Sequence, residues 1–108
     1  MSAPAQRAVV VDAVRTPQAR KNGALADQYP EALVTTVLDA LCDRSGVPAA
    51  AWEDFRLGCA NQEHEQGRNL ARQSLLAGGV PESVPGSTVT RLCGSSLSAL
   101  NAASRAIE

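Results

Sequence analysis

The chain has 108 residues, the length of one small domain; 44% of them are hydrophobic but only 3% aromatic, so its core must be built from Val, Leu and Ala. Ten basic and eleven acidic side chains give a net charge of −1, and no run of like charge exceeds two residues, which argues against nucleic acid or an anionic membrane as the main partner. Because no 18-residue apolar run and no apolar leader are found, we expect neither a membrane span nor a signal peptide, and a cytoplasmic location.

The first predicted element is a central strand over residues 8–14, because a continuous β-branched run is typical of a strand buried on both faces of a mostly parallel sheet. A loop rich in turn residues follows over 18–28. Pro30 then begins a predicted helix that runs to about Arg44, where Gly46 supplies a left-handed stop. The helix carries one apolar stripe: Val34, Val37, Leu38 and Leu41.

Strands and helices continue to alternate along the rest of the chain. We predict a helical turn over 48–53, strands over 55–60 and 87–92, and helices over 68–77 and 94–107. This alternation predicts an α/β fold with crossover connections. The last helix is rich in small residues on nearly every face, so we expect it to be buried between layers. No glycine-rich nucleotide-binding loop occurs, which disfavours a nucleotide enzyme.

Two cysteines and the single histidine are expected to have structural or surface roles. Cys42 lies beside the apolar stripe and Cys59 lies in the second strand, so both are predicted to be core thiols. His64 lies in a polar loop, and a solvated surface histidine is expected rather than a general base. The odd number of cysteines without paired spacing argues against a zinc site and indicates a reducing compartment.

Cys93 is the candidate nucleophile, because it lies where the third strand is predicted to meet the last helix. Gly94 is predicted to make a sharp turn there, so that the helix begins almost on top of the sulfur. The free N–H groups of the first helical turn and the helix dipole would favour thiolate over thiol. Taken alone, the spacing fits a buried structural cysteine equally well, so both interpretations stay open at this point.

Four sequence blocks, in the right order, resemble the N-terminal part of thiolases, the acetyl-CoA acyltransferases. They are Val11-Asp-Ala-Val-Arg-Thr-Pro17 with Gly23-Ala-Leu25 after it, Gly58-Cys-Ala-Asn-Gln62, Glu65-Gln-Gly-Arg-Asn-Leu-Ala-Arg72, and Val84-Pro-Gly-Ser-Thr-Val-Thr-Arg-Leu-Cys-Gly-Ser-Ser-Leu97. The resemblance runs from about residue 9 to 108. It implies the N-terminal part of a layered α/β/α/β/α fold, with a mixed sheet and a buried helix after the nucleophile.

The resemblance also implies the chemistry of Cys93. The sulfur would attack the keto carbon of a 3-ketoacyl-CoA, expel acetyl-CoA, and hold the shortened acyl chain as a thioester until a second CoA removes it. The reverse reaction is a Claisen condensation of two acyl-CoA molecules. Coenzyme A is then a substrate, and no cofactor is implied. Thr90 replaces the family's usual Asn; Ser96 replaces a frequent Gly, as in thiolases of fatty-acid oxidation, which favours the degradative direction of β-oxidation.

Two parts of the family's catalytic machinery are not in this sequence. The activating His of a Gly-His-Pro block and the second Cys of a Cys-Gly-Gly-Gly block belong to the C-terminal half of thiolases. We therefore expect residues 1–108 to be a truncated part of the thiolase N-terminal domain, inactive alone, from an acyltransferase that is a homodimer or homotetramer when full length. Two alternatives are a non-catalytic thiolase-like module that binds acyl-CoA or lipid, and a condensing enzyme of the ketoacyl-synthase type.

Overall fold

Two short parallel strands form the centre of the fold in the computed structural model, which describes residues 3–108. Residues 1 and 2 of the predicted segment 1–108 lie outside the described residues. Strand β1 (Phe55–Gly58) pairs with β2 (Gly86–Val89), with Phe55 opposite Gly86 and Gly58 opposite Val89. Because parallel neighbours cannot be joined by a hairpin, the chain crosses over between them through helix α2 (Leu70–Ala77).

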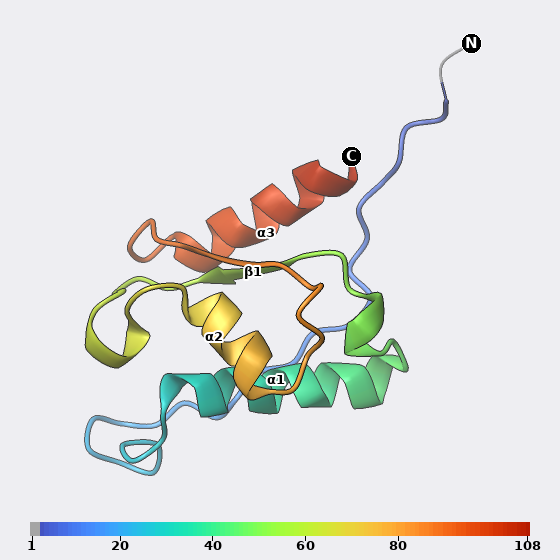
Figure 1. Ribbon diagram of the computed structural model, residues 1–108. Helices are drawn as coiled ribbons and strands as arrows, with labels where there is room; N and C mark the ends of the chain where they lie inside the picture. Colours follow the sequence, from blue (N-terminus) through green and yellow to red (C-terminus); the bar gives the residue numbers. More distant parts are fainter. Residues whose placement is uncertain (1–2) are drawn as a thin grey trace.

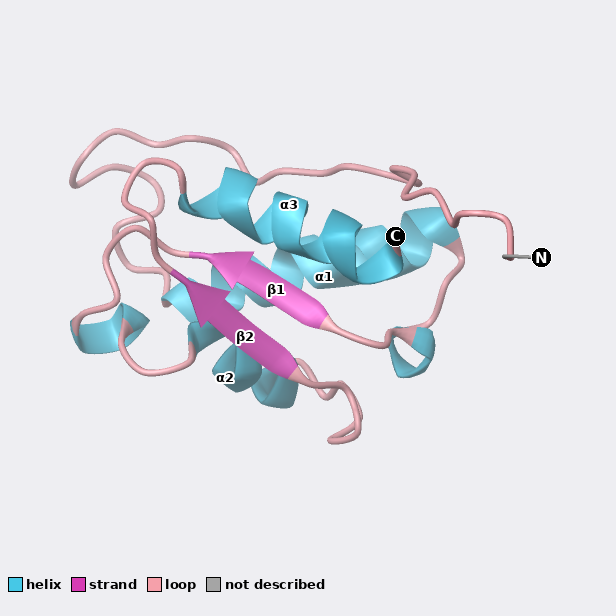
Figure 2. Ribbon diagram, turned by 90° about the horizontal axis from the view of Figure 1, so that it is seen from above, coloured by secondary structure: helices cyan, strands magenta, loops and turns pink. Residues whose placement is uncertain are grey.

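Helices cover both faces of this pair of strands (Figure 1). Helix α3 (Ser95–Ile107) packs on β1 from one side, while α2 packs on the other side and separates the strands from α1 (Pro30–Ser45). Figure 2 shows both strand arrows pointing the same way, so their carboxyl ends meet at one edge of the sheet. The predicted α/β arrangement with a crossover connection is confirmed.

Helix α1 matches the predicted helix over 30–44 and ends one residue later. Gly46 caps it in the left-handed conformation, with φ 73°, and donates its backbone N–H to the Cys42 carbonyl at 3.0 Å. Leu38, from the predicted stripe, is buried in a core with three residues of the second half of the chain. These are Leu75, Val80 and Val84, and Trp52 and Phe55 pack against them. Two 3₁₀ turns, Ala49–Ala51 and His64–Gln66, complete the regular structure, and the first confirms the predicted helical turn.

The predicted helix over 68–77 begins later than expected, at Leu70. Asn69 is its N-cap: the Oδ1 atom accepts the Arg72 backbone N–H at 3.3 Å. Arg68, before the cap, has a left-handed φ of 59° and so cannot belong to the helix. The cap also binds the sheet, since Asn69 Nδ2 donates to the Gly86 carbonyl at 2.8 Å. The start of α2 is therefore fixed by its contact with β2.

Residues 8–14 form no strand, so this prediction is wrong for the described chain. Val9, Val10 and Val11 are 74–77% exposed, and the segment runs alongside α1 and α3 without joining the sheet (Figure 1). A strand forms only where a neighbouring strand satisfies its backbone N–H and C=O groups, and neither β1 nor β2 pairs with this segment. The Arg44 Nη2 atom holds it to the end of α1 through a 3.1 Å ion pair with Asp12 Oδ1.

Helix α3 is not buried between layers, so the prediction that this last helix would be buried is wrong. Its inner face buries Ser95 and Ala99, but Leu97 and Leu100 are 64% and 58% exposed. The outer apolar face of α3 and the valines of the N-terminal segment border an open groove of about 680 Å³. In the described chain a two-stranded parallel sheet stands in place of the expected mixed sheet, and these residues do not form the full α/β/α/β/α layering.

Candidate active site

Cys93 lies at the carboxyl-end edge of the sheet, in the turn that joins β2 to α3. All three cysteines of the sequence are free, and Cys93 is exposed whereas Cys42 and Cys59 are partly buried. The predicted strand 87–92 was expected to lead directly into Cys93, but β2 ends at Val89, three residues earlier. The parallel ladder closes there, where the Cys59 backbone N–H donates to the Val89 carbonyl at 3.0 Å.

The turn before Cys93 is made by Leu92 and not by Gly94. Leu92 adopts a left-handed φ of 49°, while Gly94 has φ −92° and ψ 9°, a conformation open to any residue. Two backbone hydrogen bonds close the turn: Gly94 N–H to the Arg91 carbonyl at 3.0 Å and Ser95 N–H to the Leu92 carbonyl at 3.1 Å. A left-handed leucine costs about 1–2 kcal/mol. Because the Leu92 side chain is 72% exposed, little packing offsets this strain.

The first turn of α3 rests directly on the backbone of β1. At Gly58, a Cβ atom would lie 2.5 Å from the Ser95 carbonyl carbon and from Ser96 Cα, and it would also meet the Ser96 nitrogen. Real Cβ atoms essentially never approach backbone atoms so closely. Gly58 therefore allows the close approach that places the start of α3, and with it Cys93, over the end of β1.

The loop after β1 is tied to the turn that carries Cys93. Thr90 Oγ1 donates to the Ala60 carbonyl at 3.2 Å, so the residue that departs from the family's usual Asn joins the two loops. Within the β1 loop, Gln66 Nε2 donates to the Asn61 carbonyl at 2.6 Å, and Cys59 Sγ lies 3.5 Å from the same oxygen. The predicted core thiol Cys59 is thus partly buried beside this loop. The loop is ordered by its own hydrogen bonds.

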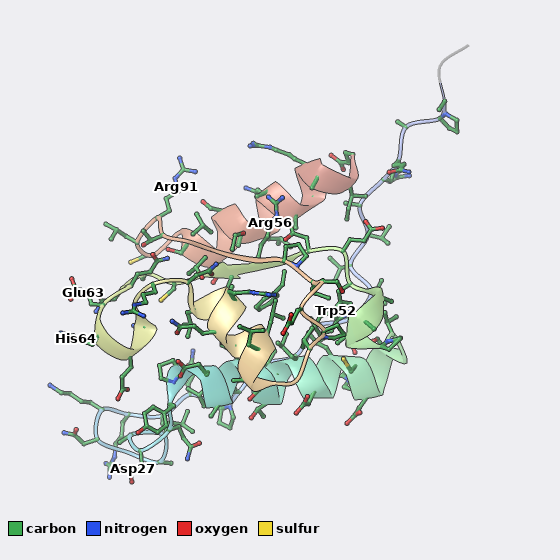
Figure 3. All side chains as sticks on the ribbon, viewed as in Figure 1. Asp27, Trp52, Arg56, Glu63, His64 and Arg91 are labelled. Atoms are coloured by element: carbon green, nitrogen blue, oxygen red, sulfur yellow. The ribbon has the colours of Figure 1, made fainter. Side chains whose placement is uncertain are left out.

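The charged side chains at this end of the molecule point outward. Figure 3 shows Glu63 and His64 on the loop after β1, and Arg91 extending away from the fold beside the start of α3. His64 is exposed, in agreement with the prediction of a surface histidine, and its φ is 51°. Arg91 Nη1 contacts Ser98 Oγ at 3.4 Å. Within residues 3–108 no group of three His, Cys, Asp or Glu side chains is placed to hold a metal ion.

The arrangement presents an accessible thiol at the N-terminus of a helix thirteen residues long. The first N–H groups of a helix lack intrahelical acceptors, and the helix dipole is positive at this end, so negative charge that develops on a bound carbonyl oxygen is favoured there. Such a site can form a covalent thioester with an acyl group.

Three residues of the site were missed by the analysis of the sequence. Ser95 is 3% exposed and its hydroxyl binds the turn, as a serine at the start of a helix can do. Gly58 could have been found, because a glycine inside a strand often marks a close backbone approach. Leu92 carries no such signal, since leucine has no preference for the left-handed conformation.

Comparison with known proteins identifies the family. The family model "Thiolase, N-terminal domain" matches residues 8–108. The chain is 48% identical over 99 residues to the β-ketoadipyl-CoA thiolase of Pseudomonas aeruginosa, covering 91% of the chain and 25% of that protein. It is 46% identical over 101 residues to the 3-ketoacyl-CoA thiolase of Pseudoalteromonas translucida, covering 92% of the chain and 26% of that protein.

A solved structure agrees with this relationship. The crystal structure of the Bacillus anthracis acetyl-CoA acetyltransferase superposes with a TM-score of 0.85 at 32% identity, over 93% of this chain and 25% of that one. The chain thus spans about a quarter of the length of the curated relatives it matches. The resemblance seen in the four sequence blocks is confirmed, and the chain belongs to the thiolase family, whose N-terminal domain model matches residues 8–108.

Proposed function

We propose that this chain is the N-terminal segment of a thiolase and that Cys93 is its acylated nucleophile. The observation that carries the proposal is the placement of Cys93: of the three cysteines, all within the described residues, it is the exposed one, and it directly precedes the N-cap of α3. The match of residues 8–108 to the thiolase N-terminal domain supports the same assignment.

In the proposed thiolysis, the Cys93 sulfur attacks the keto carbon, C3, of a 3-ketoacyl-CoA. The bond between C2 and C3 then breaks, its electron pair leaves with C2, and protonation of that carbon releases acetyl-CoA. The shortened acyl group remains on sulfur as a thioester. The thiol of a second CoA attacks the thioester carbonyl, takes the acyl group, and returns the sulfur of Cys93 to its free form. The residues that move these protons would come from the rest of the polypeptide.

The substrate class and assembly follow from the same proposal. Curated relatives are named for 3-ketoacyl-CoA and β-ketoadipyl-CoA, which supports a 3-ketoacyl-CoA substrate and the degradative direction, as in fatty-acid oxidation. CoA and acyl-CoA would bind at the carboxyl-end edge, near Cys93. We propose that the full-length enzyme is a homodimer or homotetramer, and that residues 1–108 alone do not turn over.

The test replaces the nucleophile in the complete protein. Cys93→Ala should abolish thiolysis of a 3-ketoacyl-CoA, while circular dichroism and size-exclusion chromatography stay unchanged. Cys42→Ala is the matched control, because that thiol is partly buried in α1, and it should keep most of the activity. Substantial thiolysis by the Cys93→Ala enzyme would sink the assignment.

Two further measurements separate the alternative functions. Incubation with acetyl-CoA followed by peptide mass spectrometry should place an acetyl group on Cys93; a non-catalytic module that binds acyl-CoA or lipid would leave this thiol unmodified. A condensing enzyme of the ketoacyl-synthase type would instead accept the acyl group from a carrier-protein thioester in preference to the CoA thioester.

A further inference from the structure

We propose that Ser95 is a positioning residue that holds Cys93 for reaction through a single buried hydroxyl group. The inference rests on the proposed function of Cys93 as the nucleophile. It concerns how the turn between β2 and α3 is kept in the one conformation that presents the sulfur at the start of the helix.

The Ser95 hydroxyl reaches back past Cys93 to the two residues that precede it. Its Oγ atom accepts the Arg91 backbone N–H at 2.7 Å and donates to the Leu92 carbonyl at 2.6 Å. The Leu92 carbonyl also accepts the Ser95 backbone N–H at 3.1 Å. Two donors from one residue therefore fix the carbonyl of the peptide group that joins Leu92 to Cys93. Because a peptide group is planar, fixing this carbonyl also fixes the orientation of the Cys93 nitrogen.

The turn requires such a restraint. Leu92 is left-handed, a conformation that a leucine leaves readily when nothing holds it, and its exposed side chain supplies little packing. Arg91 and Cys93 are exposed as well. Ser95, at 3% exposure, is the buried side chain of this segment, so water competes poorly for its two hydrogen bonds.

The direction of these bonds distinguishes Ser95 from an ordinary helix cap. A capping serine precedes the helix and accepts an N–H group from its first turn. Ser95 is already inside α3, and the N-cap residue, Gly94, has no side chain that could cap the helix. The Ser95 hydroxyl instead reaches back to the two residues that precede Cys93. The hydroxyl therefore stabilises the turn that carries Cys93 and makes no hydrogen bond to the later residues of α3.

Ser74 provides a matched control within the same chain. It is also a helical serine, fully buried at 0% exposure, but its Oγ has no hydrogen-bond partner among the described residues. Removing either hydroxyl deletes one buried oxygen from a helix. Only the Ser95 substitution removes a contact to the turn of Cys93.

The experiment measures acetylation of Cys42, Cys59 and Cys93 in the complete protein by a small acetyl thioester. The sulfur attacks the thioester carbonyl carbon, the bond from that carbon to the thioester sulfur breaks, and the small thiol leaves; peptide mass spectrometry gives one rate for each cysteine. Ser95→Ala removes both hydrogen bonds of the hydroxyl and should slow acetylation of Cys93 at least about tenfold, since the loss of one buried hydrogen bond alone corresponds to about that factor. Ser95→Thr, which keeps the hydroxyl, should recover most of the rate, and Ser74→Ala should leave it within about twofold of the native rate.

Cys42 and Cys59 report on the rest of the fold in the same digest. If Ser95→Ala changes Cys93 alone, the role of Ser95 is local, as proposed. If the rate at Cys93 is unchanged, if Ser95→Thr is as slow as Ser95→Ala, or if Cys42 and Cys59 also become reactive, Ser95 is at most a structural residue and the proposal is overturned.

A measurement on the native chain tests the geometry without any variant. Hydrogen–deuterium exchange should show a protected Arg91 amide in spite of the exposed position of that residue; exchange as fast as in a free peptide would contradict the hydrogen bond to Ser95. In the complete native protein, a Cys93 that is acetylated no faster than Cys42 and Cys59 would instead refute the proposed nucleophile, and the two failures are therefore distinguishable.

Discussion

A single methyl group added at Gly58 should displace the start of α3 and Cys93 with it. In Gly58→Ala the new Cβ would lie 2.5 Å from the Ser95 carbonyl carbon and Ser96 Cα, and ordinary contact begins at 3.4 Å. Because the Ser96 nitrogen would lie nearer still, the helix start must retreat by about 1 Å. Since the obstructing atoms belong to the backbone, no side-chain rotation can relieve the contact.

The expected cost has two parts. Overpacking of this kind lowers the free energy of unfolding by about 1–3 kcal/mol. With a urea m-value of about 1–3 kcal/mol per M, the midpoint should fall by about 1 M, and the fluorescence of the single tryptophan, Trp52, which packs against the core, can follow it. A displacement of about 1 Å can also cost about a hundredfold in the rate of a positioned reaction, so acetylation of Cys93 should slow well beyond what the stability change explains.

Gly94→Ala is the control for Gly58→Ala, because it adds the same methyl group next to the same cysteine. At Gly94 the nearest atom to a Cβ would be the Arg91 carbonyl oxygen at 3.5 Å, and the φ of −92° suits any residue. This variant should stay within about 0.5 kcal/mol of the native free energy of unfolding. Equal urea midpoints and equal Cys93 acetylation rates for the two variants would refute the close packing of α3 on β1.

Two further substitutions test the turn and the start of α2. Leu92→Asn should raise the free energy of unfolding by about 0.5–1 kcal/mol, because asparagine tolerates the left-handed conformation better than leucine; a lower urea midpoint would argue against a left-handed residue at this position. Asn69→Ala should lower the free energy of unfolding by about 2–3 kcal/mol, because it removes the cap of α2, the bond to the Gly86 carbonyl, and the 2.8 Å bond from Thr88 Oγ1. Asn69→Asp keeps the two contacts in which residue 69 accepts a hydrogen bond, from the Arg72 N–H and from Thr88 Oγ1, and should lose only part of this free energy of unfolding in the same urea titration. An equal loss in the two variants would show that these two contacts contribute nothing to stability.

Helix α1 was predictable because its boundaries are set by local chemistry. Pro30 suits the first turn of a helix and Gly46 suits the left-handed cap, and both residues do in the structure what their chemistry favours. The β-branched run at 8–14 failed because a strand depends on a partner that local sequence does not specify. The predicted lengths of β1 and β2 were wrong for the same reason, since each strand ends where its pairing with the other ends.

The candidate site divides in a similar way. Cys93 could be proposed from its residue type and from the four matching blocks, and the structure adds that its side chain is exposed before the start of α3. The left-handed conformation of Leu92 and the two hydrogen bonds of the Ser95 hydroxyl are properties of the folded turn. Leucine and serine have many other conformations available, so no local preference identifies these two.

The ion pair between Arg44 and Asp12 bears on how the chain behaves at high concentration. Three successive exposed valines precede Asp12, and an apolar, β-branched segment without proline is the kind that pairs with copies of itself. The pair keeps this segment beside its own α1, at an effective intramolecular concentration that a second chain matches only when protein is abundant. Because the Arg44 side chain is 60% exposed, salt screens the pair in part. Self-association through the N-terminal segment should therefore increase with ionic strength and with protein concentration.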